Sequence, residues 1–166
     1  DLFITPNRYA NYICKGAKLN TQLFEWPVDI NYFPYLPKEE CQRFLYVHGN
    51  GGYSGRKGGG VIEELLARYR HIPLTIISSN PQGFLRVHQK NNCPNLKIVK
   101  PPSSNKHLYD EGDVLLYPAH LDGHGLQPIE AMSTGMPVIS TSGNPWNEYP
   151  SMFRIPSQIG SKKIKR

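Results

Sequence analysis

Residues 122–139, DGHGLQPIEAMSTGMPVI, are the stretch that decides the fold of this chain. They follow the apolar run Asp113–Tyr117, which predicts a strand, and their first glycines predict a loop. The apolar residues that come next predict a helix over Leu126–Thr134, which Gly135 is suited to end. A second strand is predicted at Val138–Ser140. The succession of strand, glycine loop, helix and strand indicates an α/β fold.

Two carboxylates mark the loop and the helix of this stretch. Asp122 lies in the glycine loop and Glu130 lies on the helix. A carboxylate accepts hydrogen bonds from neighbouring hydroxyls, so Glu130 suits a ribose and Asp122 suits a sugar ring. Gly123 and Gly125 allow a phosphate to approach the N–H groups of the helix N-terminus, which attracts negative charge. The structural alternatives are an exposed helix glutamate and a helix-capping aspartate.

Length and composition indicate one soluble, globular domain. The 166 residues are 39% hydrophobic and 19% charged, and the hydrophobic runs fall short of the roughly 20 residues that span a bilayer. Three cysteines without metal-type spacing favour a reducing, cytoplasmic location. Because the chain starts at Asp1 rather than methionine, we expect a piece of a longer protein.

The net charge of +6 suggests anionic partners. Four basic residues lie within positions 161–166, and without them the net charge falls to +2. A solvated tail explains this better than a nucleic-acid patch, so nucleic acid is a disfavoured partner. Docking on anionic lipid, as a peripheral membrane contact, stays open as an alternative.

The whole chain alternates strands and helices, which predicts a Rossmann-like, doubly wound parallel sheet. The predicted strands are continuous apolar runs, as in sheets that are covered on both faces. In such sheets ligands bind beyond the carboxyl ends of the strands. Helix residues Leu126, Ile129 and Met132 are expected to face the core. The further strands are predicted at Leu2–Thr5, Gln22–Glu25, Phe44–His48, Leu74–Ser78 and Leu96–Val99, and the further helices at Arg8–Lys15, Val61–Tyr69 and, for one short turn, near Lys106–Tyr109.

A second glycine-rich loop, residues 49–60, connects a predicted strand to a predicted helix. Its backbone amides could surround a phosphate, with full charge from Arg56 or Lys57. It is not a P-loop, because Gly58 follows the lysine where Ser or Thr would hold magnesium. A long surface turn is the alternative interpretation.

Among the six histidines, His124 is placed for function because it lies between two loop glycines, and His120 is the second candidate. A serine triad is disfavoured, since the chain has no Gly-x-Ser-x-Gly motif.

Taken together, these motifs resemble the C-terminal, donor-binding domain of a GT-B glycosyltransferase, close to retaining family 4. Lys57-Gly58 matches the lysine-glycine that opens the first helix of that domain, and residues 27–34 resemble the interdomain hinge. The family pattern of Pro-Ser, E-G-F-G-L, E-A-M and G-x-P-V is matched by Pro118-Ala119, Asp122–Leu126, Glu130–Met132 and Gly135–Val138.

The resemblance implies a hexosyl transfer that retains the anomeric configuration, with a UDP- or GDP-sugar as donor and no metal. Residues 1–26 would end the preceding N-terminal domain, 27–38 would be the hinge, and 39–166 would bind the nucleotide sugar. Asp122 and Glu130 are the implied catalytic acids. The implied diphosphate ligands are Gly51, Gly52, Arg56 and Lys57, and the implied ribose and sugar ligands are Glu130, Asp122, Gly123, His124, Gly125 and Leu126, with His120 and Glu148 as additional candidates.

Three positions depart from the family pattern: Asp122 stands for Glu, His124 for Phe, and Gly52 for an arginine. The acceptor, whether glycan, lipid or protein, is not identified, and the N-terminal acceptor domain is missing. The fragment is therefore expected to bind donor, while turnover by it alone stays open. A nucleotide-sugar epimerase and a non-catalytic nucleotide-sugar module remain as alternatives.

Overall fold

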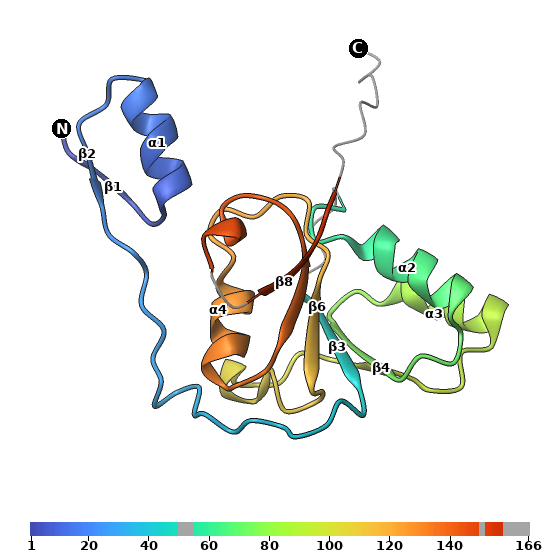
Figure 1. Ribbon diagram of the computed structural model, residues 1–166. Coiled ribbons are helices and arrows are strands. Elements are labelled where there is room, and N and C mark those ends of the chain that lie inside the picture. The colour runs from blue at the N-terminus through green and yellow to red at the C-terminus, as the bar shows by residue number, and fades with distance from the viewer. Residues whose placement is uncertain (50–54, 150–151, 158–166) are drawn as a thin grey trace, which may run out of the picture.

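A six-stranded, fully parallel sheet organises the chain in the order β5-β4-β3-β6-β7-β8 (Figure 1). The structure is a computed structural model, which describes residues 1–49, 55–149 and 152–157. The order confirms the predicted Rossmann-like, doubly wound fold. The strands are β3 (Phe44–Gly49), β4 (Leu74–Ser78), β5 (Leu96–Val99), β6 (Val114–Tyr117), β7 (Val138–Thr141) and β8 (Met152–Ile155).

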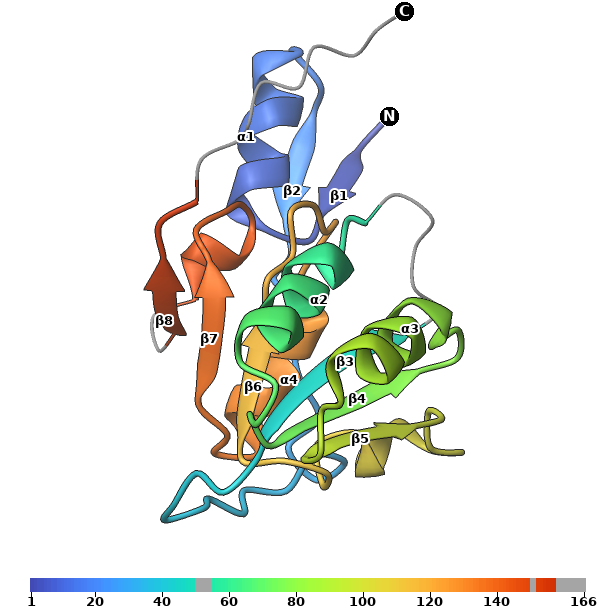
Figure 2. The ribbon, with the colours of Figure 1, turned by 90° about the vertical axis from the view of Figure 1, so that its right-hand side faces the viewer.

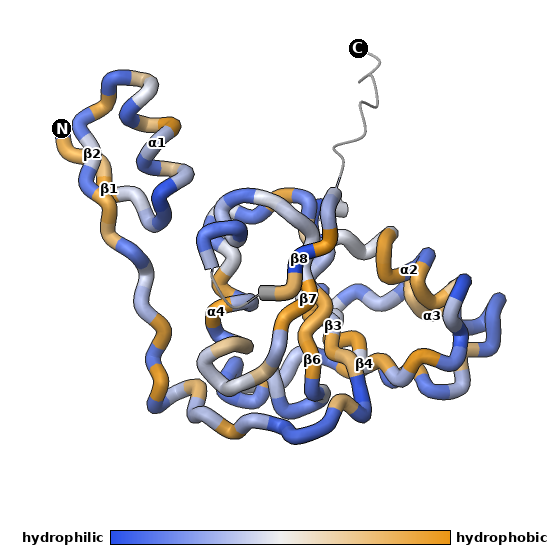
Figure 3. The backbone as a smooth tube through the Cα atoms, in the orientation of Figure 1, coloured by the Kyte–Doolittle hydropathy of each residue, from blue (hydrophilic) through white to orange (hydrophobic). Residues whose placement is uncertain are grey.

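Helices cover both faces of the sheet. Helices α2 and α3 lie together on one face, and α4 lies on the other (Figures 1 and 2). Hydrophobic residues gather along the strands of the sheet (Figure 3). Strand β4 is buried along its whole length, as its continuous apolar run predicts. The bounds are α2 (Gly59–Arg68), α3 (Gln82–Asn91) and α4 (Leu126–Ser133), with the 3₁₀ turns η1 (Asn105–His107) and η2 (Trp146–Glu148).

Side chains of β3 alternate between two hydrophobic clusters. Leu45 and Val47 belong to the cluster under α4, together with Ala131 of that helix. Tyr46 points to the opposite cluster, where it meets Ile62 of α2. These central side chains are at most 3% exposed, so the sheet is buried on both faces at β3. Among the described residues, no helix is long and apolar enough to cross a bilayer.

The order of the sheet reverses between β3 and β6, which lie side by side in its middle. The chain leaves β3 toward β4 on one side and leaves β6 toward β7 on the other. Since both strands run in the same direction, the loops after them meet at one edge of the sheet. This switch point brings together the two glycine-rich loops that the sequence singles out.

Some local predictions are wrong at the level of single elements. Leu126 was expected in the core, but it is 38% exposed, and α4 buries Pro128 and Ala131 instead. Helix α2 starts two residues early, at Gly59, and its end leaves Tyr69 exposed. The sequence analysis did not predict α3 and β8. Helix α3 is polar and buries Phe84 alone, and β8 is a short edge strand, so neither has a strong apolar period.

The first residues form a separate βαβ unit beside the sheet (Figures 1 and 2). Its two parallel strands flank one helix, which Asn7 caps by accepting from the N–H of Ala10 at 2.7 Å. The unit carries exposed apolar side chains, among them Ile4, Tyr12 and Phe24. Its elements are β1 (Phe3–Thr5), α1 (Arg8–Gly16) and β2 (Thr21–Leu23).

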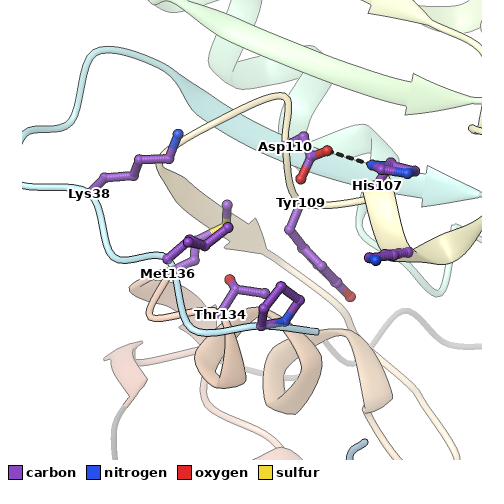
Figure 4. A pocket seen from close by; sticks show the side chains of 9 residues that line it. Lys38, His107, Tyr109, Asp110, Thr134 and Met136 are labelled. Atoms are coloured by element: carbon purple, nitrogen blue, oxygen red, sulfur yellow. Dashed lines mark hydrogen bonds and ion pairs between the residues drawn. The ribbon is translucent and has the colours of Figure 1, made fainter. Parts of the chain in front are cut away.

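The proline-rich connection is attached to the main sheet domain at its C-terminal end. Phe33 is 6% exposed, and its ring packs edge-on against Tyr109, with 5.8 Å between centroids. The N–H of Leu36 donates to the carbonyl of Thr134 at 2.8 Å. A cavity of about 230 Å³ lies beside this connection, with Tyr109 and Met136 on its wall and Lys38 at its rim (Figure 4). The part from Phe33 onward is thus docked on the sheet domain.

Phe33→Ala should destabilise the chain by about 3 kcal/mol, because it removes a buried ring and leaves a cavity beside Tyr109. Urea unfolding followed by circular dichroism measures the change. Ile30→Ala, at a side chain that is 70% exposed in the same connection, is the control and should be neutral. Equal effects of the two substitutions would show that Phe33 does not anchor the connection.

Candidate functional site

An open cleft of about 400 Å³ lies where the ends of β3 and β6 meet. It is formed by the two glycine-rich loops, the first turns of α4 and the segment after β5. Its walls therefore come from elements that the doubly wound topology brings to the switch point. The lining residues include Gly49, Lys57, Asp122, His124, Leu126 and Glu130, together with Pro101 and Asn105 beyond β5.

Lys57 and Asp122 form an ion pair inside this cleft. Their side chains are only 16% and 15% exposed. The hydroxyl of Tyr117 donates to the same carboxylate oxygen of Asp122 at 2.6 Å, and the Lys57 ammonium lies 5.6 Å from the Tyr117 ring centroid. The backbone N–H of His124 reaches the other carboxylate oxygen at 3.4 Å. Asp122 is thus held from three directions.

Opposing effects set the pKa of Asp122. Burial tends to raise it, but hydrogen bonds from Lys57 and Tyr117 outweigh burial and hold the pKa at about 2. Burial and the bond to Asp122 raise the pKa of Tyr117 far above its ordinary value. At neutral pH the site therefore holds a carboxylate at Asp122 and a neutral hydroxyl donor at Tyr117.

Two glycines determine how the helices enter the cleft. Gly58 caps α2 with φ +77°, and Gly125 caps α4 with φ +78°, a conformation that favours glycine. A side chain at Gly58 would overlap the backbone carbonyl of Pro118. Because glycine has no capping side chain, the first N–H groups of both helices depend on other partners, which makes each end a suitable anion site.

Glu130 faces the same cleft from α4. The hydroxyl of Tyr109, a side chain that is 4% exposed, donates to it at 2.6 Å. Burial and the nearby Glu130 raise the pKa of Tyr109, so this hydroxyl remains a donor. A carboxylate that accepts one such bond still has acceptor sites for hydroxyls of a ligand. Glu130 is therefore held in place and not a solvated surface residue.

His124 has an unusual environment in the loop. Neither of its buried ring nitrogens has a hydrogen-bond partner within the described ranges. Burial lowers the pKa of His124, which favours the neutral imidazole, although Asp122 and Glu148 act in the opposite direction. The ring of Trp26, from the segment that follows β2, lies 6.3 Å away between centroids. Asp122 does not cap α4, because the cap is Gly125.

Three other predicted site residues that the structure describes, Arg56, His120 and Glu148, do not line the cleft. Arg56 is exposed, and its carbonyl accepts from the backbone N–H of His120 at 2.7 Å, which joins the two glycine-rich loops. The side chain of His120 is also exposed. Glu148 binds the N-terminus of α1 rather than lining the cleft. Gly51 and Gly52 lie outside the described residues.

Sequence reasoning did not find Tyr109, Tyr117, Asn7 or Trp26 as parts of the site. Tyr117 ends β6 directly before the loop, which is a usable signal for a cleft residue. Tyr109 precedes β6 by several residues, and its approach to Glu130 depends on how α4 packs. No group of three metal-ligating side chains gathers within the part of the chain that the structure describes.

Residues 76–150 match the sequence profile of the family described as glycosyl transferases group 1. The match covers less than half of the chain and includes both Asp122 and Glu130. No relative among the curated proteins matches the chain's sequence.

Solved structures agree with the fold of the chain. Sucrose-phosphate synthase from Thermosynechococcus elongatus has a TM-score of 0.73 and 19% identity, over 89% of this chain and 42% of that one. A glycosyltransferase from Rickettsia africae has a TM-score of 0.69 and 16% identity, over 92% and 48%. HepE of Anabaena, in complex with UDP-glucose, has a TM-score of 0.68 and 17% identity, over 93% and 49%.

The chain spans less than half the length of each of these proteins. The likeness confirms the predicted fold, the C-terminal domain of the GT-B type.

Gly58→Ala should destabilise the chain by more than about 3 kcal/mol, because it adds left-handed strain and an overlap with Pro118. Gly60→Ala is the matched control, since Gly60 lies in the same helix with open space around it. The control should be neutral or stabilising by up to about 1 kcal/mol. Thermal unfolding measures both, and a tolerated Gly58→Ala would refute the close packing.

Asp122→Asn should make the domain less sensitive to acid. The lowered pKa of Asp122 contributes stability above its usual pKa near 4, and this contribution of about 2 kcal/mol is lost as the pH falls toward 2. Urea unfolding at pH 6 and pH 2.5 should therefore show a larger acid loss in the unmodified chain than in Asp122→Asn. Glu40→Gln, at an exposed acid, should behave as the unmodified chain does.

Proposed function

We propose that the chain is the donor-binding half of a glycosyltransferase that takes a sugar from a nucleotide diphosphate sugar. The observation that carries this proposal is the convergence of Lys57, Asp122 and Glu130 on one cleft at the switch point. A cation suits a diphosphate, and two carboxylates suit ribose and sugar hydroxyls. HepE, which shares the fold, has structures with UDP and glucose and with UDP-glucose, which supports this class of donor.

The diphosphate would bind between Lys57 and the starts of α2 and α4. Lys57 supplies full charge, Arg56 adds charge from the exposed rim, and the helix N-termini add N–H donors. Because Asp122 holds the Lys57 ammonium, Lys57 has to exchange partner, wholly or in part, when the diphosphate arrives. The same groups would then stabilise the charge on the departing nucleoside diphosphate. Gly51 and Gly52 belong to the proposed diphosphate set by sequence alone.

The sugars would bind along the two carboxylates. Glu130, held by Tyr109, would accept from the ribose hydroxyls. Asp122 would accept from the transferred sugar, and the loop amides from Gly123 to Leu126 would assist it. Asp122 becomes available to a sugar as Lys57 turns to the diphosphate, so binding at the two ends of the donor would be coupled.

Further features complete the proposal. Retention of configuration, independence of metal and a preceding acceptor domain follow from the family resemblance, and a cytoplasmic location follows from the cysteine pattern. The domain boundaries at residues 26/27 and 38/39 are proposed on the same ground. The acceptor and the base are outcomes to be measured.

A thermal-shift screen with UDP-, GDP- and ADP-sugars tests the donor class. At a hundred times the Kd, a matching nucleotide sugar should stabilise the chain by about 2.7 kcal/mol, which is about 5–10 °C in Tm for a chain of this size. Glu130→Ala should abolish the shift, because it removes the acceptor for the ribose hydroxyls. Glu64→Ala, at an exposed acid of α2 that pairs with Arg68, is the control and should keep it.

The absence of a shift with every nucleotide would reject the proposal. A shift without sugar transfer by the full-length protein would favour the non-catalytic module. Conversion of the free nucleotide sugar without an acceptor would favour an epimerase.

A further inference from the structure

The N-terminal βαβ unit contacts the loop that carries Asp122 and His124, which is the proposed sugar-binding loop. The side-chain amide of Asn7 donates to the carbonyl of Gly123 at 3.1 Å. Asn7 is 3% exposed, and its carbonyl oxygen at the same time caps α1. One buried side chain therefore joins the first turn of α1 to the loop between the two proposed donor ligands Asp122 and His124.

A second attachment is made by Glu148. Its two carboxylate oxygens accept from the backbone N–H groups of Arg8 and Tyr9, at 2.9 and 2.7 Å. These are the first two N–H groups of α1, whose first turn contains no acid of its own. An acid 140 positions beyond Arg8 thus provides the negative charge that the helix N-terminus favours.

Tyr149, next to Glu148, makes a third contact that holds this loop. Its hydroxyl donates to the carbonyl of His124 at 2.7 Å. Burial, with Glu148 and Asp122 nearby, raises the pKa of Tyr149 to about 12, so the hydroxyl stays protonated at neutral pH. We call Asn7, Glu148 and Tyr149 the loop clamp.

The clamp determines the direction of the loop amides. In a trans peptide the N–H points opposite to the carbonyl. Since the carbonyl of Gly123 is held by Asn7, the N–H of His124 turns the other way, and it is found on Asp122. Since the carbonyl of His124 is held by Tyr149, the N–H of Gly125 turns away from Tyr149. The N–H of His124 thus faces the Asp122 carboxylate.

We propose that Asn7 and Glu148 are positioning residues, which fasten helix α1 to the sugar-binding loop and so hold its amides and Asp122 in place for the transferred sugar. This inference rests on the proposed donor site. It gives Glu148 a role through α1 rather than through contact with the donor. It also makes the N-terminal unit part of the donor site, which the sheet domain by itself does not complete.

The loop clamp predicts a selective loss of affinity for the sugar part of the donor. Asn7→Ser keeps a hydroxyl that can cap α1, but serine is too short to reach Gly123. Glu148→Gln keeps one acceptor and places an amide against the second N–H group. Both variants should bind UDP-glucose or GDP-mannose about tenfold more weakly in calorimetry, while their Kd for UDP or GDP stays within about twofold.

Arg8→Ala is the matched control. Its side chain pairs with Glu25 at the surface, where both are more than 60% exposed, and its backbone N–H still reaches Glu148. Affinity for nucleotide and nucleotide sugar should both be unchanged. Equal losses for nucleotide and nucleotide sugar in Asn7→Ser, or no loss, would overturn the proposal.

Hydrogen–deuterium exchange separates failure of the clamp from failure of the proposed function. The amides of residues 123–126 should exchange faster in Asn7→Ser and Glu148→Gln than in Arg8→Ala, with or without nucleotide. If the unmodified chain binds none of the UDP-, GDP- and ADP-sugars, the donor assignment fails and the role in sugar binding is overturned with it. Exchange rates equal to those of Arg8→Ala would overturn the clamp itself.

Discussion

The close packing of Gly58 on the carbonyl of Pro118 is the constraint on which the site depends. It allows the start of α2 to lie against the end of β6, so Lys57 meets Asp122 although 65 positions separate them. The parallel sheet provides the frame, because β3 and β6 end at one edge while their helices cover opposite faces. A side chain at position 58 would force these two loops apart.

Within that frame, buried tyrosines keep the two carboxylates in place. Tyr117 donates to Asp122 and Tyr109 donates to Glu130, both at 2.6 Å. Each acid loses part of its freedom but keeps acceptor capacity, since a carboxylate has about four acceptor positions. The site is thereby organised before a ligand arrives, which reduces the entropic cost of binding.

The βαβ unit at the N-terminus contributes to this organisation from outside the sheet. The first N–H groups of its helix α1 donate to the carboxylate of Glu148, and the side-chain amide of Asn7 donates to the carbonyl of Gly123. The ring of Trp26, just after β2, lies 6.3 Å from that of His124 between centroids, tilted by 59°. The loop that carries Asp122 therefore has the sheet domain on one side and this unit on the other.

The sequence by itself determined the fold class and the two glycine-rich loops at the carboxyl ends of strands, which carry Lys57 and Asp122, and it singled out Glu130 on the helix that follows. Apolar runs, glycines and helix ends are local properties, so these features can be inferred from neighbouring residues. Only the tertiary structure decided the exposure of Leu126, the partners of Glu148, and the tyrosines beneath the acids. It also decided α3 and β8, whose weak apolar patterns become stable elements through packing on the sheet. The physical reason is that these features depend on contacts between segments far apart in the chain, which no local pattern records.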